Sequence, residues 1–162
     1  KIIFLKSSNF FVRLKYFVKA YFKIRSCRNM NEFLNFNING VDLGKIVYDQ
    51  YIRYSGIGTT NIFSRIFYAN LAKAFLVHHQ MEKYFKKYNF ICSVQGENQF
   101  IPGAIMFQSA LKNGVNVYSK HGPSNSFTVR KYTNIDQKYK PIDRYSKKIY
   151  ELININIKKN QE

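Results

Sequence analysis

Two side chains that can act as acids or bases follow short apolar runs of this sequence. Glu97 lies in the polar segment 95–99, after the apolar run 90–94. His121 follows a second apolar run, 115–118. A positioned carboxylate or imidazole can act as a general base that takes the proton of a hydroxyl group. The sequence therefore predicts Glu97 and His121 as catalytic residues; the alternative is a solvated loop residue and an ordinary turn residue.

Further polar residues are candidates for binding a substrate. The stretch 39–54 holds two glycines at the start of an expected helix, where the backbone can approach another chain or a ligand closely. Free N–H groups at such a start favour an anion. The predicted substrate-binding residues are Asp42, Gly44, Lys45, Tyr48 and Arg53, together with Gln95 and Asn98 after the first apolar run. The alternative is a packed helix whose tyrosine tips reach water.

The elements that would position these residues form a βαβ unit. The run 90–94 is typical of a buried strand, and apolar residues at helical spacing follow Pro102, which suits a first helical turn. Gly114 can end that helix before the second strand, 115–118. Strands joined in this way are parallel, with a right-handed crossover, and ligands gather at their C-terminal ends. The sequence thus predicts an α/β fold with both catalytic candidates at one sheet edge.

Other segments complete the expected domain. Residues 10–26 and 62–88 show apolar side chains at helical spacing. Residues 28–39 are expected to be irregular or extended, with the alternation of a half-buried strand at 34–39. The remaining expected elements are strands at 1–6 and 127–132 and helices at 42–54 and 142–153. His78 and His79 are neighbours in the long helix and point apart, so neither is predicted as a metal ligand.

The helix expected at 10–26 interleaves basic and apolar residues. Arg13, Lys15, Lys19 and Lys23 alternate with a broad aromatic and aliphatic face. Such a helix can pack one face on the body of the protein. It can also bind anionic lipid or a lipid-linked phosphate in a salt-sensitive manner, without spanning the bilayer. Both interpretations stay open at this point.

The composition allows one domain and excludes several classes of protein. A chain of 162 residues can bury a core, and a hydrophobic share of 46% excludes disorder. No apolar run approaches the roughly 20 residues of a membrane span. The cysteines form neither a zinc site nor a disulfide framework, which favours a reducing cytoplasm, and Cys92 is expected to be buried. The net charge of +17 suits an anionic partner, although codon bias from an AT-rich genome explains it equally.

The chain carries the stretches NGVDLGKIVYDQYIRY and SVQGENQFIPGAIMFQSALKNGVNVY. They resemble bacterial capsule and surface-polysaccharide biosynthesis proteins, which are similar to GT-B glycosyltransferases. The matching positions are Gly44, Ile46, Tyr48, Asp49, Tyr51 and Arg53 in the first stretch, and Gly103, Ala110, Gly114, Val117 and Tyr118 in the second. Lys45 stands where the family has an acidic residue, and segment 95–100 replaces the usual His and Tyr. The resemblance covers residues 39–118.

This resemblance implies a Rossmann-like parallel sheet flanked by helices, one half of a GT-B architecture. Residues 1–162 would be a single domain, the N-terminal, acceptor-side part of a longer two-domain enzyme. The implied reaction transfers a sugar from a nucleotide-sugar donor to a sugar or lipid-linked acceptor. No metal and no cofactor are expected, because the nucleotide-sugar is a substrate. The expected location is the cytoplasm, peripherally on the inner face of the cytoplasmic membrane.

The alternative function is a non-catalytic basic module that binds nucleic acid or an anionic membrane surface. Of these two ligands, nucleic acid is not the expected partner. Lysines gathered on one face would favour this module. A deep cleft beside Glu97 and Gly44 would favour the enzyme.

Overall fold

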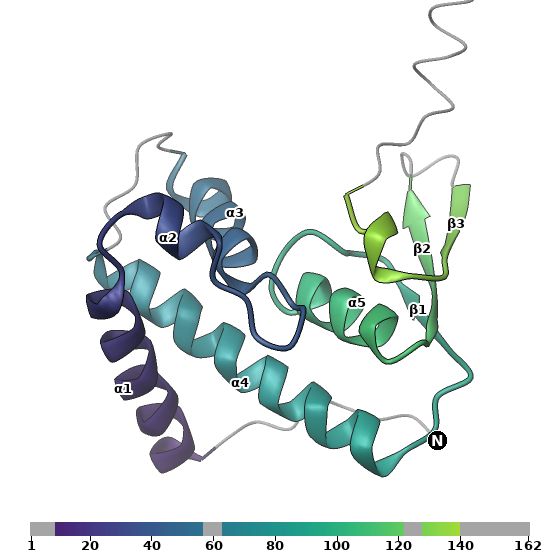
Figure 1. The fold of residues 1–162 in the computed structure, drawn as a ribbon, viewed down its shortest axis with the longest axis horizontal. Helices are drawn as coiled ribbons and strands as arrows, with labels where there is room; N and C mark the ends of the chain where they lie inside the picture. The colour runs from purple at the N-terminus through teal and green to yellow at the C-terminus, as the bar shows by residue number, and fades with distance from the viewer. Residues whose placement is uncertain (1–8, 57–62, 122–127, 140–162) are drawn as a thin grey trace, which may run out of the picture.

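The computed structural model describes residues 9–56, 63–121 and 128–139. Within them the chain is a mixed α/β fold, in which a small three-stranded sheet is flanked by helices (Figure 1). The elements in chain order are α1 (Phe10–Ser26), α2 (Met30–Leu34), α3 (Leu43–Ser55), α4 (Arg65–Lys87), β1 (Cys92–Gln95), α5 (Gly103–Lys112), β2 (Asn116–His121), β3 (Thr128–Tyr132) and the 3-10 turn η1 (Ile135–Gln137). The strand expected at 1–6 and the helix expected at 142–153 lie outside the described residues.

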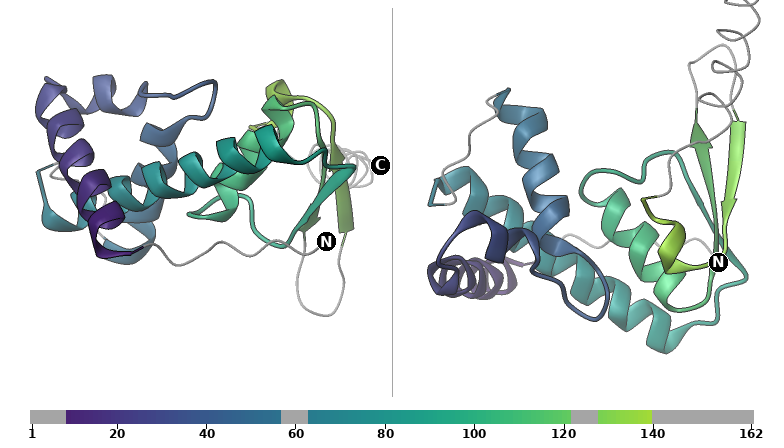
Figure 2. Two further views of the ribbon diagram at one scale, coloured as in Figure 1. Left: turned by 90° about the horizontal axis from the view of Figure 1, so that it is seen from below. Right: turned by 45° about the horizontal axis from the view of Figure 1, so that its top comes forward.

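Helix α1 begins where the sequence predicts. The Asn9 side chain accepts a hydrogen bond from the Val12 N–H at 3.0 Å, which satisfies a free donor of the first turn. Tyr16, Ala20 and Ile24 recur at i, i+4 and are buried. This stripe faces the body of the protein, because α1 packs along α4 (Figure 2). The prediction of an amphipathic helix over residues 10–26 is therefore confirmed.

Helix α4 is the centre of the helical part and contacts α1, α3 and α5. Ser64 caps it by accepting from the Phe67 N–H at 3.3 Å, so the helix starts later than the predicted residue 62. Phe67 is fully buried, with its ring 4.8 Å from Phe33 and 5.4 Å from Tyr51 between centroids. These rings tie α2 and α3 to α4.

The extended segment predicted for residues 28–39 is wrong in its first half, which folds as α2. Asn29 accepts from the Glu32 N–H at 2.9 Å, and the Glu32 carboxylate accepts from the Arg28 N–H at 2.9 Å. These two hydrogen bonds cap the start of α2 and stabilise one helical turn where the sequence predicts an irregular or extended segment. The turn buries Phe33 completely, and extended pairing survives only as a bridge between Ile38 and Val41.

The predicted βαβ unit is present. β1 and β2 pair in parallel, with Ser93 opposite Val117, and α5 crosses one face of the pair. The prediction of an all-parallel sheet is nevertheless wrong, because β3 runs antiparallel to β2. Only residues 122–127 separate these strands, which is too short for the crossover that a parallel return needs. The observed sheet is therefore small and mixed.

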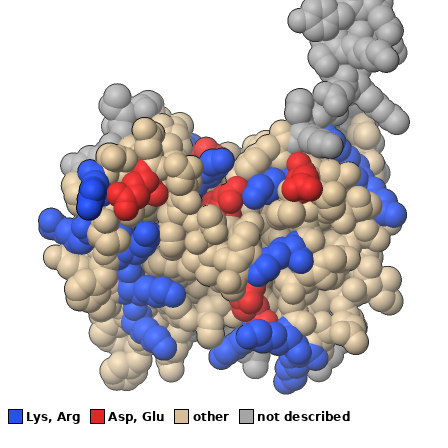
Figure 3. All heavy atoms as spheres, in the orientation of Figure 1, with Lys and Arg blue, Asp and Glu red and all other residues tan. Residues whose placement is uncertain are grey.

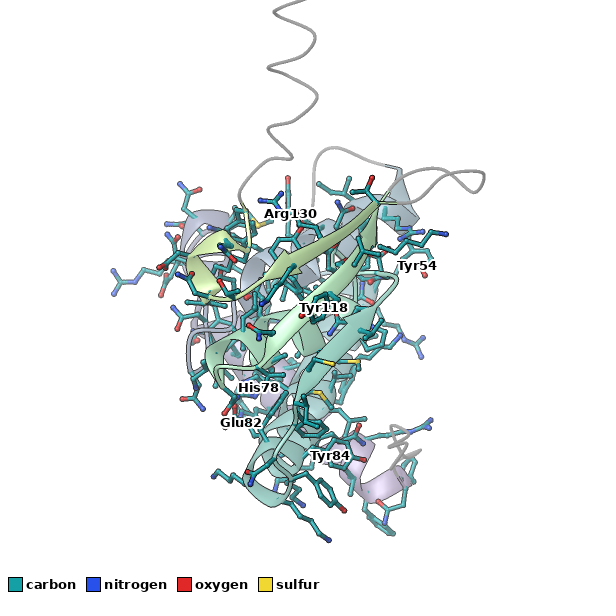
Figure 4. The ribbon with its side chains drawn as sticks, turned by 90° about the vertical axis from the view of Figure 1, so that its right-hand side faces the viewer. Tyr54, His78, Glu82, Tyr84, Tyr118 and Arg130 are labelled. Carbon is teal, nitrogen blue, oxygen red and sulfur yellow. The ribbon has the colours of Figure 1, made fainter. Side chains whose placement is uncertain are left out.

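The first strand differs from the predicted buried run. It begins at Cys92, and only Ser93 and Gln95 turn toward α5. The opposite face of the sheet carries no helix among the described residues (Figure 4). For this reason Ile91 is 94% and Val94 79% exposed, and Cys92 is exposed, not buried as predicted.

The second strand extends past its predicted end. Pairing with β3 continues to His121, which lies opposite Thr128. His121 is therefore the last residue of a strand, and its prediction as a loop residue is wrong. Its side chain is outside the described part of the structure.

The buried side chains form two clusters. The larger joins α1, α2, α3 and α4 with the start of α5 and includes Phe67 and Ile105. The smaller joins the end of α5 with β2 and β3 and includes Phe107, Val117 and Tyr132. Helix α5 belongs to both clusters.

Candidate functional site

A cleft of about 740 Å³ opens between α3 and α5. In the space-filling view the surface is hollowed between the two lobes, and side chains of both charges gather there (Figure 3). The lining residues are Ile46, Asp49, Ile52 and Arg53 of α3, Asn98, Gln99 and Phe100 of the β1–α5 loop, Ala104, Phe107 and Gln108 of α5, and Tyr132, Lys138 and Tyr139. Amide, charged and aromatic groups thus share one concave site.

One end of the cleft is built around Arg53. Its guanidinium lies 3.7 Å from a carboxylate oxygen of Glu97, and its Cζ lies 4.1 Å from the centre of the Phe100 ring. The second carboxylate oxygen of Glu97 accepts from the Gln99 N–H at 2.6 Å. Both Glu97 oxygens therefore have partners, which fix the β1–α5 loop and orient Arg53.

Two buried contacts place this loop. The Gln50 side chain, on α3, accepts from the Ile101 N–H at 2.9 Å. Gly103 starts α5 against the carbonyl of Glu97, and a Cβ at that position would overlap this oxygen. The loop is thus held from α3 and from α5 at the same time.

The other end of the cleft is built around Asp42. Its carboxylate accepts from the Tyr139 hydroxyl at 2.7 Å and pairs with the Lys138 ammonium at 2.8 Å. Its backbone N–H donates to the side-chain oxygen of Gln108 at 2.8 Å. The Lys45 ammonium lies 5.1 Å from the centre of the Tyr139 ring. Segment 138–139 is in this way attached to the start of α3.

These contacts shift two ionisation equilibria in opposite directions. Partial burial acts to raise the pKa of Asp42, but hydrogen bonds from Lys138 and Tyr139 and the charges of Lys138 and Lys45 outweigh it and lower this pKa. Burial, followed by the hydrogen bond to Asp42, raises the pKa of the Tyr139 hydroxyl above its usual value. Asp42 therefore stays ionised and Tyr139 stays a hydrogen-bond donor at neutral pH.

Protonation of Asp42 should weaken the fold in acid. Because the folded-state pKa is lowered, the ionised group contributes stability above the unfolded pKa, and this is lost as the pH falls through the folded pKa. Asp42→Asn should lower the free energy of unfolding by about 1.5 kcal/mol near neutral pH. Below both pKa values it should change little. Urea unfolding at neutral pH and below both pKa values measures the two effects, with the exposed Asp136→Asn as the matched control. An equal loss of unfolding free energy at the two pH values would contradict a stabilising role of the ionised Asp42 carboxylate.

The structure brings only some of the predicted site residues together. Arg53 and Asn98 line the cleft, and Glu97 contacts Arg53. Asp42 and Lys45 reach its other end through Tyr139.

Three predicted binding residues lie apart from the cleft lining. Gly44 is buried against the Phe33 carbonyl, and its N–H donates to the Phe36 oxygen at 2.9 Å, so it is not free for an anion. Tyr48 is partly buried in α3 and is not among the lining residues. Gln95 is buried at the end of β1, where its amide nitrogen donates to the Ser93 hydroxyl at 3.0 Å.

Sequence reasoning missed several residues that line the cleft, and also Gln50, which holds the loop beside it. Gln50 and Gln108 are buried glutamines on otherwise apolar helix faces, and that pattern was a usable signal for a side chain with a fixed partner. Asp49 lies one helical turn before Arg53 and shares its face. Burial raises the pKa of Asp49, and the charge of Lys45 opposes this in part. Tyr139 lies in a polar segment of the sequence, and no pattern there marks it as a site residue.

Comparisons with protein families, with curated proteins and with solved structures found no match for this chain. Among the described residues, no three His, Cys, Asp or Glu side chains are grouped as a metal site would require. None of the described helices is both long and apolar enough to cross a membrane.

Proposed function

We propose that this chain supplies the acceptor-binding site of a glycosyltransferase-like enzyme of surface-polysaccharide biosynthesis, as one Rossmann-like half of a GT-B architecture. The observation that carries the proposal is the cleft between α3 and α5. It follows the C-terminal end of a parallel strand, where ligands of α/β folds gather. Its volume of about 740 Å³ is large enough for an oligosaccharide end.

The cleft lining supports a carbohydrate ligand. Asn98 and Gln99 offer amide groups that both donate to and accept from hydroxyls. Phe100 and Tyr139 add aromatic faces against which the apolar side of a sugar ring can pack. Asp49 and Arg53 give the lining both signs of charge, which is unfavourable for a polyanion such as nucleic acid.

The base of the proposed reaction would come from a cleft carboxylate. The sequence predicts Glu97, and the structure gives both of its oxygens partners. We place the proton-accepting role on Asp49, because it lines the cleft and partial burial raises its pKa above the usual aspartate value. Glu97 would act as a positioning residue that orients Arg53. The sugar itself would come from a nucleotide-sugar held by another part of the enzyme.

Sugar binding to this chain tests the proposal directly. Glucose, galactose and N-acetylglucosamine, added singly at millimolar concentration, should shift the backbone amide resonances of residues 98–101 and of α3. Asn98→Ala should weaken the response about fivefold through the loss of one side-chain hydrogen bond. Asn116→Ala, at a partly buried asparagine of β2, is the matched control and should leave it unchanged. Absence of shifts around the cleft for every sugar would reject the proposal.

A further inference from the structure

Helix α1 buries one narrow stripe and leaves a wide apolar face in solvent. Phe10, Phe11, Leu14, Val18, Tyr21 and Phe22 are exposed on one side of the helix, with Phe17 exposed beside them, and we call the surface of these seven side chains the α1 face. Phe11 is 76% and Phe22 66% exposed. Phe63, just before α4, is also exposed. The Arg25 guanidinium lies over both the Tyr21 and Phe63 rings and so connects Phe63 to the α1 face. Soluble surfaces rarely gather so many aromatic rings without a partner.

Basic side chains border the α1 face. Lys15 lies at one border of the face, Lys19 and Lys23 continue from it at i, i+4 toward the body of the protein, and α1 contains no Asp or Glu. The ammonium groups of Lys19 and Lys23 lie over the rings of Phe75 and Phe36, at 4.6 and 4.4 Å from their centres. Figure 3 shows Lys and Arg side chains over the part of the surface that α1 covers. The apolar face and its border are thus fixed relative to each other.

We propose that the α1 face docks on an anionic lipid bilayer and lies in its interfacial plane. Aromatic and aliphatic groups enter the boundary of the acyl chains, while the ammonium group of Lys15 contacts lipid phosphates. A second copy of the chain fits poorly, because it would bring two basic borders together. The buried stripe of Tyr16, Ala20 and Ile24 stays on α4, so docking needs no unfolding of the helix. This surface is separate from the cleft, and the inference does not depend on its ligand.

A tryptophan probe tests the contact at a chosen site. The sequence has no tryptophan, so Phe11→Trp introduces a single reporter with little change of shape. The emission of this variant should shift to the blue with vesicles of phosphatidylglycerol and phosphatidylcholine in equal parts, and should stay unchanged with phosphatidylcholine alone. Val94→Trp, at an exposed apolar residue of β1, is the matched control and should not respond. No shift at Phe11→Trp, or an equal shift at Val94→Trp, would overturn the proposal.

Vesicle co-sedimentation separates the apolar contribution from the charges. Phe11→Ser combined with Phe22→Ser should weaken binding about tenfold or more, whereas Ile91→Ser with Val94→Ser should not. Lys15→Glu should weaken it about fivefold or more, and Lys131→Glu on β3 is the control for net charge. Binding that is insensitive to salt, or equally reduced by both charge variants, would contradict docking through the α1 face. A blue shift that grows with protein concentration without vesicles would assign the face to self-association instead.

Discussion

Under the proposed function, Asp49→Asn is expected to lower turnover by about 100- to 10,000-fold, the usual contribution of a positioned general base. The amide keeps the shape of the side chain but cannot take a proton, so sugar affinity and melting temperature should change little. Because burial raises the pKa of Asp49, the acidic limb of the kcat/KM profile should lie above the usual aspartate range and disappear in the variant. A residue with a purely structural role would not move that limb.

Glu97→Gln is the matched comparison. It leaves the Arg53 side chain without its carboxylate partner but keeps an oxygen for the Gln99 N–H. We expect a smaller loss, about tenfold, expressed mainly as a raised KM, because Arg53 would be less well oriented. If Glu97→Gln loses more turnover than Asp49→Asn, and the pH profile of Asp49→Asn is unchanged, the base is Glu97.

Gly44→Ala should lower the free energy of unfolding by about 2 kcal/mol. Alanine gains about 1 kcal/mol in helix propensity over glycine, but overpacking costs about 3 kcal/mol where the backbone cannot yield. A Cβ on Gly44 would overlap the Phe33 carbonyl oxygen and lie 3.0 Å from that of Leu34. Urea unfolding with an unchanged m-value measures the loss.

The control for this substitution is Gly96→Ala in the β1–α5 loop. A Cβ on Gly96 meets no atom within 4 Å, so its effect should stay within about 0.5 kcal/mol. If Gly44→Ala is as stable as Gly96→Ala, α2 does not pack on α3 as closely as described.

Local sequence signals predicted α1, α3, α4 and α5, but not α2, because the causes of these four helices are local. The cap at Asn9, the apolar spacing of α1 and the strand–helix–strand order around α5 all lie within short segments. The direction of β3 follows from the short connection 122–127, which the prediction of a parallel sheet overlooked. The exposure of Cys92 was missed because it depends on which face of the sheet is covered. That coverage is a tertiary property, and an apolar run alone does not distinguish one buried face from two.

The residues of the candidate site also divide into those that a local sequence pattern marks and those that it does not. Arg53 was found because its helix has a glycine-rich start, and Asn98 was found because it follows a strand end. Gln108 and Tyr139 reach the cleft through contacts with Asp42, from which they are separated by 66 and 97 positions. No local pattern encodes such a distance. Gly44, predicted at a ligand, instead meets the backbone of α2, since the freedom of glycine serves packing and binding equally.

The cleft lies across the seam of the two cores. Ile46 and Ala104 belong to the larger core, Phe107 and Tyr132 belong to the smaller, and all four line the cleft. Helix α5 contributes to both cores, so a rotation of one core about this helix would change the width of the cleft opening. A ligand that contacts both walls would hold the two cores at one angle. Part of its binding free energy would then offset the loss of the other angles between the cores.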